Sequence, residues 1–348
     1  MMRAPGFWWR TPPSALARLT YPLGAIYGAA TLTRMRRPGI RAGVPVICVG
    51  NFIVGGAGKT PTVLALAALL AARGETPFVL SRGYGGCEAG PVLADPARHG
   101  AAEIGDEPLL MAHHLPVVVA RDRPAGAALA AACGASVVLM DDGLQNPSLR
   151  KDLRLAVVEG AAGIGNGYCF PAGPLRAPME GQLGETDAVV VNGPGAAGDA
   201  VAALAQAAGR PVLRVGLDVL PEALARLDGL AVIAASGIGR PEKFATTLRQ
   251  SGARLVGERR YGDHHPYTAG DVATLLAESK ATGSTIAVTE KDMVKLAPLW
   301  PADERERLLA VPVQLRFDDE AAIGALLEQA LTSSGTAAAA DPQLHRLG

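Results

Sequence analysis

The chain has 348 residues with 33 acidic and 33 Lys or Arg side chains, so its formal net charge is zero. A balanced charge gives no general attraction to nucleic acid, and we predict no nucleic-acid partner. The length has room for about two domains. The cysteines are scattered without a C-x-x-C pair, at Cys48, Cys87, Cys133 and Cys169. This spacing does not fit a cysteine metal site, and we predict no disulfide framework.

The first 42 residues are apolar at the start and basic at the end. Aromatic residues at 7–9 precede apolar side chains near helical spacing, at Leu16, Leu19, Leu23, Ile26 and Tyr27. Arg18 and Pro22 interrupt this run, which is too broken for a membrane span or a signal peptide. Two interpretations stay open: a helix packed on the domain, or an amphipathic helix lying in a bilayer interface. In the second, anionic headgroups would meet Arg34, Arg36, Arg37 and Arg41.

A strand, a glycine-rich turn and a helix are predicted in succession over residues 44–70. Backbone amides of such a turn and the following helix N-terminus bind phosphate groups. The strict phosphate-loop pattern is not met, because Ile53 stands at the first glycine position. We predict ATP binding here, with Lys59 reaching the β- and γ-phosphates and the Thr60 hydroxyl on Mg²⁺. The predicted ATP-binding residues are Ile53, Val54, Gly55, Gly56, Ala57, Gly58, Lys59 and Thr60.

Beyond this turn, short apolar segments rich in β-branched residues alternate with helical patterns. The predicted strands are 76–80, 116–120, 135–140, 153–158 and 186–191. Runs of this kind are typical of parallel strands that are buried on both faces. We therefore predict an α/β fold in which residues 43–210 form a P-loop NTPase-like domain with a mostly parallel sheet.

A second, smaller α/β domain is predicted over residues 226–331. Its predicted strands are 230–235, 254–257, 285–288 and 311–317, with helices at 241–251, 268–278 and 320–331. Residues 211–225 are predicted to be an extended connector, and residues 1–42 the separate N-terminal segment. The Ala-, Ser- and Thr-rich residues 332–348 are predicted to be disordered.

Acidic residues at predicted strand and helix ends are the candidates for chemistry. Asp141 and Asp142 follow the buried run 137–140, and an acid at this place holds Mg²⁺ beside a phosphate loop. A pair of this kind is also common in turns, but the phosphate loop upstream favours the metal. Asp106 precedes a helix and is either an ordinary N-cap or a general base. His264 stands beside Asp263 and can orient a carboxylate or share its proton.

Glycine-rich polar loops follow several predicted strands, where ligands bind in open α/β sheets. Arg82 and Arg176 are candidates for a substrate phosphate or sugar, against the simpler interpretation of solvated arginines in turns. The full set of substrate candidates is Arg82, Gln145, Asn166 and Arg176. A further polar loop reads Thr289-Glu290-Lys291-Asp292.

These motifs, in this order, resemble the tetraacyldisaccharide 4'-kinase family, the lipid A disaccharide kinases. The resemblance covers most of the chain: V-G-N-F-I-V-G-G-A-G-K-T-P, S-R-G-Y-G-G, G-D-E-P, D-D-G-L-Q, P-A-G-P-L-R, D-H-H and T-E-K-D. It implies ATP- and Mg²⁺-dependent phosphorylation of the 4'-hydroxyl of a tetraacylated glucosamine disaccharide 1-phosphate. It also implies a peripheral enzyme on an anionic membrane surface, the cytoplasmic face of the bacterial inner membrane.

By the matching motifs, Asp106, His264 and Lys59 would be catalytic, and Asp141, Asp142 and Thr60 would hold the metal. The resemblance gives His265 no catalytic role. One departure is Ala177, where many members carry Glu after the Arg of P-A-G-P-L-R; any role of that acid is lost or falls to Glu180.

Two alternatives belong to other classes. A nucleotide-driven switch or metallochaperone ATPase shares the G-G-x-G-K-T loop, but such proteins carry Lys before the glycine pair, where this chain has Val54. A non-enzymatic peripheral membrane module would leave the carboxylates at the strand ends without a purpose.

Overall fold

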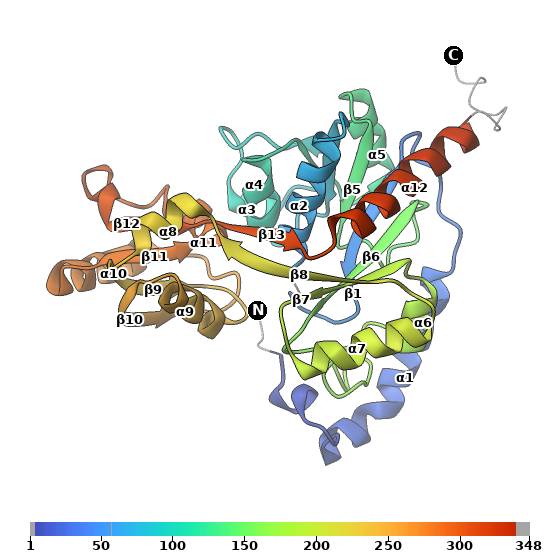
Figure 1. Ribbon diagram of the computed structural model, residues 1–348, viewed down its shortest axis with the longest axis horizontal. Helices are drawn as coiled ribbons and strands as arrows, with labels where there is room; N and C mark the ends of the chain where they lie inside the picture. Colours follow the sequence, from blue (N-terminus) through green and yellow to red (C-terminus); the bar gives the residue numbers. More distant parts are fainter. Residues whose placement is uncertain (1–3, 57, 339–348) are drawn as a thin grey trace.

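The computed structural model describes residues 4–56 and 58–338, which form two lobes (Figure 1). The large lobe comprises residues 4–219 and 313–338, and the small lobe residues 220–312. A nine-stranded sheet of order β13-β8-β7-β6-β1-β5-β2-β4-β3 runs through the large lobe. Its strands are β1 (Val46–Asn51), β2 (Pro77–Ser81), β3 (Val92–Leu93), β4 (Val117–Val119), β5 (Val137–Asp141), β6 (Leu153–Glu159), β7 (Ala188–Asn192), β8 (Val212–Val219) and β13 (Val313–Phe317).

Neighbouring strands from β8 to β4 are parallel, while β13 and β3 join the two edges antiparallel. Each central strand is apolar on both faces: Ile47 and Val49 of β1 face one side of the sheet, and Val46 and Cys48 the other. Burial on both faces is what a parallel sheet between two helix layers requires. The predicted parallel α/β fold is confirmed.

Helices cover both faces of this sheet. One face packs against α2 (Lys59–Ala71), α4 (Asp106–Ala112) and α12 (Glu320–Ala338). The other packs against α5 (Arg123–Ala132), α6 (Met179–Gly184) and α7 (Ala196–Ala207). The short helix α3 (Ala101–Ile104) ends directly before α4. Because β1, β2 and β5 are parallel neighbours, their carboxyl ends open at one edge of the sheet, near the small lobe.

The small lobe has a four-stranded parallel sheet of order β10-β9-β11-β12. Its strands are β9 (Ala231–Ser236), β10 (Arg254–Arg260), β11 (Thr285–Thr289) and β12 (Leu308–Val311). One face packs against α8 (Pro221–Leu227) and α9 (Pro241–Gln250). The other packs against α10 (Ala269–Thr282) and α11 (Glu290–Leu296), and the 3₁₀ helix η2 (Ala302–Arg307) precedes β12.

Three predicted boundaries are wrong. Residues 211–225 are not merely an extended connector: they form β8, which joins the large sheet, and the start of α8. The strand predicted at 311–317 is divided into β12 and β13, and β13 returns to the large sheet beside β8. The last helix follows β13, and its Ile323 and Leu327 fill the core of the large lobe. An apolar strand and helix fit either sheet, so local pattern alone gave no means of choosing.

The predicted disorder of residues 332–348 is wrong over its first part, since α12 continues to Ala338. Alanine has the highest intrinsic helix propensity, and residues 337–338 continue the helix with two alanines. Residues 339–348 lie outside the described part of the chain.

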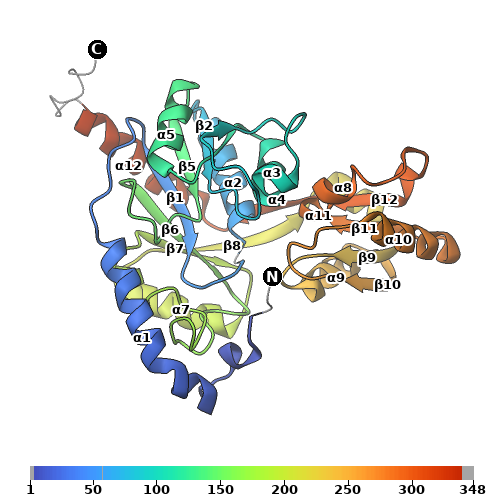
Figure 2. The ribbon, with the colours of Figure 1, turned by 180° about the vertical axis from the view of Figure 1, so that it is seen from behind.

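The N-terminal segment forms the 3₁₀ helix η1 (Gly6–Trp9) and the long helix α1 (Ala15–Met35), which runs along the outside of the large lobe (Figure 2). Small residues make its closest contact, because a Cβ at Gly24 or Gly28 would lie 2.6 Å from an atom of Cys169. The large apolar side chains point outward: Leu19 is 78% and Ile26 69% exposed. The amphipathic pattern predicted for this helix is therefore wrong: small residues face the protein, and large apolar side chains face outward. None of the helices in the described residues is both long and apolar enough to cross a bilayer.

Candidate active site

The glycine-rich turn lies at the carboxyl end of β1, where α2 begins at Lys59. Gly55 and Gly58 have φ of +112° and +83°, backbone conformations that L side chains rarely adopt. The turn is fixed at its start, since the Val54 amide donates to the carbonyl of Pro174 at 2.8 Å. Ala57, one of the predicted ATP-binding residues, lies outside the described residues. The observed strand, turn and helix are those that the motif predicts.

Lys59 and Arg176 converge on Asp142. The Lys59 ammonium lies 3.6 Å from Asp142 Oδ1, and Arg176 donates to both carboxylate oxygens at 3.0 Å. Burial alone would raise the pKa of Asp142, but the charges of Lys59 and Arg176 outweigh it and lower the pKa to about 2. Asp142 is therefore ionised and paired with the side chains of Lys59 and Arg176. Lys59 rests beside it, near the start of α2.

Asp141 has a different environment one residue earlier, at the end of β5. Its Oδ2 accepts a hydrogen bond from Ser81 Oγ at 3.3 Å, and its buried Oδ1 has no hydrogen-bond partner among the described residues. Burial, and then the negative charge of Glu107, raise the pKa of Asp141 to about 7. A buried carboxylate oxygen without a partner is chemically suited to a hard divalent cation.

The two acids of the predicted metal site differ: Asp141 has an oxygen without a hydrogen-bond partner among the described residues, and Asp142 is paired with Arg176. No cluster of three His, Cys, Asp or Glu suited to a metal occurs in the part of the chain that the structure describes. Mg²⁺ does not require one, since it is commonly held by one or two carboxylates together with substrate phosphates. The donors here fit such a cation.

Asp106 and His264 meet across the junction of the two lobes. Asp106 is the first residue of α4, and His264 lies in the loop between β10 and α10. His264 Nδ1 is 2.9 Å from each carboxylate oxygen of Asp106. The loop holds His264 at φ +59° while its amide donates to the carbonyl of Gly237. The sequence interpretation of these two residues as partners agrees with this contact, although 158 positions separate them.

The charges around Asp106 keep it ionised. Burial alone would raise its pKa, but the hydrogen bond with His264 and the charges of Lys291 and Lys295 lower the pKa to about 2. At neutral pH the Asp106 carboxylate is therefore ionised and can accept a hydrogen bond from a hydroxyl or N–H group. His265 points elsewhere: its ring stacks on Tyr261, and its Nε2 lies 3.2 Å from Asp271.

Of the four substrate candidates, Gln145 and Arg176 lie together, because Arg176 Nη1 donates to Gln145 Oε1 at 3.1 Å. Gln145 and Asn166 are buried, and both hydrogen-bond inside the protein, Gln145 to the carbonyl of Asn51 and Asn166 to that of Ala172. Arg176 is occupied by Asp142, as described above. Arg82 is exposed after β2. Contact of these residues with the substrate stays a prediction. The observed hydrogen bonds of Gln145, Asn166 and Arg176 hold the loops in place.

Several polar residues at the site escaped the sequence interpretation. Arg123 is buried and donates to the carbonyls of Leu80 and Asp141, which ties the ends of β2 and β5 together. Lys291 and Lys295 of α11 face Asp106 from the small lobe. The sequence predicts a polar loop that contains Lys291. Only the packing of α11 on α4 brings Lys291 next to Asp106 and Glu107.

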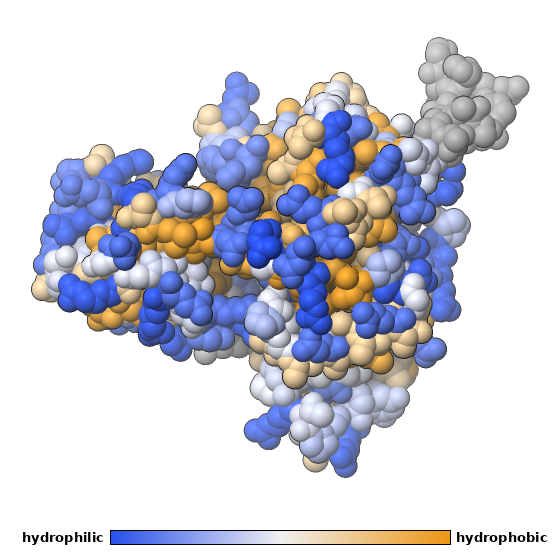
Figure 3. All heavy atoms as spheres, viewed as in Figure 1, coloured by the Kyte–Doolittle hydropathy of each residue, from blue (hydrophilic) through white to orange (hydrophobic). Residues whose placement is uncertain are grey.

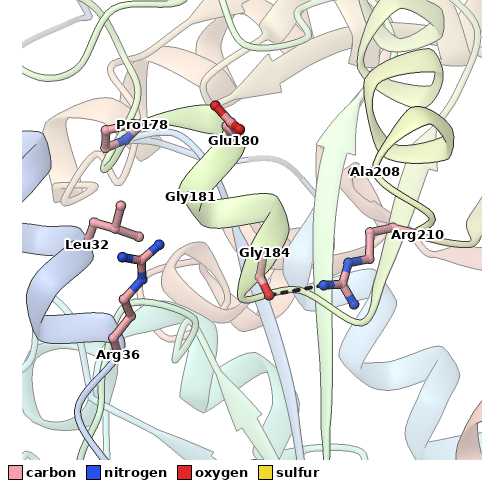
Figure 4. A pocket seen from close by; sticks show the side chains of 8 residues that line it. All are labelled: Leu32, Arg36, Pro178, Glu180, Gly181, Gly184, Ala208 and Arg210. Atoms are coloured by element: carbon pink, nitrogen blue, oxygen red, sulfur yellow. Dashed lines mark hydrogen bonds between the residues drawn. The ribbon is translucent and has the colours of Figure 1, made fainter.

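The acid that the P-A-G-P-L-R motif lacks is not replaced by Glu180. Ala177 is fully buried, so no carboxylate stands there. Glu180 is exposed and lines a pocket of about 480 Å³ between α1, α6 and the end of α7, together with Arg36 and Arg210 (Figure 4). Asp141 and Asp142 therefore stand without a third acid from this loop.

A second contact joins the lobes beside the glycine-rich turn. Glu159, at the end of β6, lies 3.2 Å from the Arg240 guanidinium and also pairs with Lys243, both from the small lobe. Glu159 is 9% exposed, so these charges are largely shielded from water. The small lobe thus contacts the large one through Glu159 as well as through Asp106, and Glu290 of α11 also lies 3.9 Å from His114 of the large lobe.

Comparison with known proteins identifies this arrangement. A family model described as tetraacyldisaccharide-1-P 4'-kinase matches residues 16–332. The chain belongs to this family. Curated tetraacyldisaccharide 4'-kinases resemble it over nearly their whole length: one from Bradyrhizobium sp. (strain BTAi1) is 54% identical over 334 residues, covering 96% of each chain. One from Methylobacterium sp. (strain 4-46) is 56% identical over 326 residues, covering 94% of this chain and 97% of its own.

A solved structure supports the fold of this tetraacyldisaccharide 4'-kinase family member. The crystal structure of the "apo" form of LpxK from Aquifex aeolicus in complex with ATP matches with a TM-score of 0.69. The match covers 91% of this chain and 99% of that one, at 23% sequence identity. At this identity the likeness concerns the fold alone.

Proposed function

We propose that this chain is an ATP- and Mg²⁺-dependent kinase that phosphorylates the 4'-hydroxyl of a tetraacylated glucosamine disaccharide 1-phosphate. Membership of the family gives the reaction, and curated relatives carry that enzyme's name. The observation on this chain that carries the proposal is the Asp106–His264 contact, which places an ionised carboxylate at the lobe junction near the phosphate loop. A switch ATPase phosphorylates no sugar hydroxyl, so it needs no carboxylate that accepts the hydroxyl proton.

In this mechanism the chain's residues position charges and one proton. The amides of the glycine-rich turn and Lys59 hold the phosphates of ATP and neutralise the charge that develops on the transferred group. Asp106 accepts the hydrogen of the 4'-hydroxyl, and His264 orients the carboxylate. Asp141 and Thr60 would hold Mg²⁺, which neutralises phosphate charge when bound. Arg176 keeps Asp142 ionised beside Lys59.

The direct test incubates the purified protein with ATP, Mg²⁺ and the acylated disaccharide 1-phosphate. We expect a product heavier by one phosphate in the mass spectrum, with the new group at the 4'-position. ATP hydrolysis at an unchanged rate with and without the lipid, and no phosphorylated lipid, would instead support the switch ATPase.

Asp141 and Asp142 should respond differently to removal of their charge. We expect Asp141→Asn to raise the Mg²⁺ concentration needed for half-maximal activity by at least about tenfold, because it alters the carboxylate with a free oxygen. Asp142→Asn should instead lower the melting temperature more, since it leaves Arg176 and Lys59 without their partner. Magnesium titrations and thermal melts of both variants check this. A larger shift in Mg²⁺ requirement for Asp142→Asn would reverse the assignment.

We also propose that α1 docks the enzyme on the anionic surface of the inner membrane, at its cytoplasmic face. The support is the outward apolar set of this helix, Leu16, Leu19, Tyr21, Leu23, Ile26 and Tyr27. Trp9 and Phe170 continue the exposed apolar set. The helix ends in exposed arginines, each worth about 1 kcal/mol near anionic lipid. An acceptor with four acyl chains is held in the bilayer, so docking brings the site to it.

The docking is tested by replacing three outward residues together, Leu19→Ser, Leu23→Ser and Ile26→Ser. These side chains are 78%, 61% and 69% exposed, so the fold should persist. We expect the variant to lose flotation with anionic liposomes and activity on vesicle-embedded substrate, while ATP binding remains.

The matched control uses exposed leucines elsewhere. In the face shown in Figure 3, apolar residues gather where β8 and α8 pass between the lobes; Leu217 and Leu224 there are 40% and 39% exposed. Leu217→Ser with Leu224→Ser should float like the wild type. Equal liposome binding by the α1 variant would place the membrane contact elsewhere.

A further inference from the structure

Lys291 of the small lobe contacts both acids at the start of α4, Asp106 and Glu107, and also contacts His264. Its ammonium lies 3.2 Å from Glu107 Oε1, 3.8 Å from Asp106 Oδ2 and 3.2 Å from His264 Nε2. Only 16% of the side chain is exposed, so these contacts are shielded from solvent. Burial alone would lower the pKa of Lys291, but its carboxylate neighbours outweigh it and raise the pKa. The side chain is therefore charged at neutral pH.

A charged lysine carries three N–H donors and no acceptor. At 3.2 Å, His264 Nε2 can only accept from it, so Nε2 carries no proton in this arrangement. The ring's proton is then on Nδ1, which is 2.9 Å from Asp106. We propose that Lys291 is a positioning residue of the catalytic pair: it holds His264 as the neutral ring protonated on Nδ1, which donates to the Asp106 carboxylate.

The alternative state of the ring is close at hand. Asp263 Oδ1 lies 3.9 Å from His264 Nε2 and 3.8 Å from the Lys291 ammonium. Without Lys291, an imidazolium would donate to Asp106 from Nδ1 and to Asp263 from Nε2, which favours the doubly protonated ring. A cationic ring paired with Asp106 weakens that carboxylate as an acceptor for the substrate hydroxyl. Lys291 therefore excludes a state of lower activity.

The ring is enclosed by groups from four elements or loops. The charged and titratable neighbours are Asp106 and Glu107 of α4, Asp263 of the same loop, Lys291 and Lys295 of α11, and Tyr84 after β2. Lys295 offers a natural comparison, since it lies one turn after Lys291 and 3.5 Å from Asp106 but pairs with Asp292 rather than with His264. Asp292 in turn accepts from the Gly237 amide, and the Gly237 carbonyl accepts from the His264 amide. Of the two lysines, Lys291 is the one that contacts the ring, while Asp292 holds the Gly237 backbone to which the His264 amide donates.

The test compares Lys291→Met, Lys291→Arg, Lys295→Met and the distant Lys280→Met. Nitrogen-15 spectra of the imidazoles, with His264→Gln to assign the signal, report the ring's protonation at neutral pH. We expect a neutral ring protonated on Nδ1 in the wild type and in Lys291→Arg, Lys295→Met and Lys280→Met, and a doubly protonated ring in Lys291→Met. Thermal melts establish that each variant is folded.

Activity gives the second measurement. We expect the ratio of kcat at pH 8 to kcat at pH 6 to be at least about threefold larger in Lys291→Met than in the wild type, because the doubly protonated ring expected in this variant loses its second proton as the pH rises. Lys291→Arg should restore the wild-type ratio. A neutral ring and an unchanged ratio in Lys291→Met, or the same changes in Lys295→Met, would overturn the proposal.

The predicted effect of Lys291 on kcat rests on the proposed function, but its effect on the protonation of His264 does not. Ring protonation is measured in the free protein and is independent of the reaction. A wild-type protein that phosphorylates no lipid would refute the function, whereas a neutral ring in Lys291→Met would refute the role of Lys291.

Discussion

Lys59→Ala should abolish phosphoryl transfer while the protein stays folded. Lys59 begins α2 directly behind the glycine-rich turn, and its ammonium is held 3.6 Å from Asp142 beside the proposed phosphate site. Losing the cation that neutralises the transferred group removes on the order of several kcal/mol of transition-state stabilisation, a fall of at least about a thousandfold. The measurement is turnover of ATP and lipid substrate under saturating conditions.

The matched control for this variant is Lys280→Ala. Lys280 is an exposed lysine of α10 that pairs with Glu304, far from the glycine-rich turn. It should keep wild-type turnover, which separates loss of a specific cation from loss of net charge. Because Asp142 loses one of two cations in Lys59→Ala, thermal melts should show a modest loss of stability and still a folded protein. Wild-type turnover in Lys59→Ala would remove the assignment of the nucleotide site.

Asp106 and His264 should behave as one unit in a double-mutant cycle. We expect Asp106→Ala to lower kcat by roughly 10²–10⁴, the usual effect of removing a general base. His264→Ala alone should also be costly, because the ring is the direct hydrogen-bond partner of both carboxylate oxygens. In the Asp106→Ala background, however, His264→Ala should change kcat only slightly, since it then has no carboxylate to orient.

The cycle requires kcat for four proteins under identical conditions, with saturating ATP and lipid. The two residues lie in different lobes, so the cycle also reports whether the lobe contact exists during turnover. If the two single losses multiply in the double variant, Asp106 and His264 act separately. His265→Ala is the neighbouring control: its ring contacts Tyr261 and Asp271 and should leave kcat nearly unchanged.

Local motifs predicted the parts of the site that one strand and its following loop supply. The glycine-rich turn, Lys59 and the acids after β5 each depend on a short stretch of chain at a strand's carboxyl end, where the fold fixes their direction. The resemblance to the kinase family then implied that Asp106 and His264 are partners. Sequence reasoning could not tell which of Asp141 and Asp142 holds the metal, because it had no means of seeing that Arg176 pairs with Asp142.

What could not be predicted depends on packing between distant elements. Lys291 acquires its neighbours only when α11 lies against α4, and Arg123 only when β2 and β5 are adjacent. Strand β13 pairs with β8 at the edge of the large sheet, and no local apolar pattern indicates that this edge is open for pairing. The inverted packing of α1 was hidden for a similar reason, since Gly24 and Gly28 give a weak periodic signal although they make the closest contact.

The pairing of β8 with β13 has a consequence for how the molecule is assembled. The chain leaves the large lobe at the end of β8 and re-enters at β13, and the Leu220 amide donates to the Pro312 carbonyl at 3.2 Å where the two crossings meet. Residues 221–311 are therefore a domain insertion whose two ends are adjacent, placed within an otherwise continuous nucleotide-binding fold. The host supplies the phosphate loop and Asp106, and the insert supplies His264 and Lys291. Neither unit by itself holds all the residues of the proposed catalytic centre.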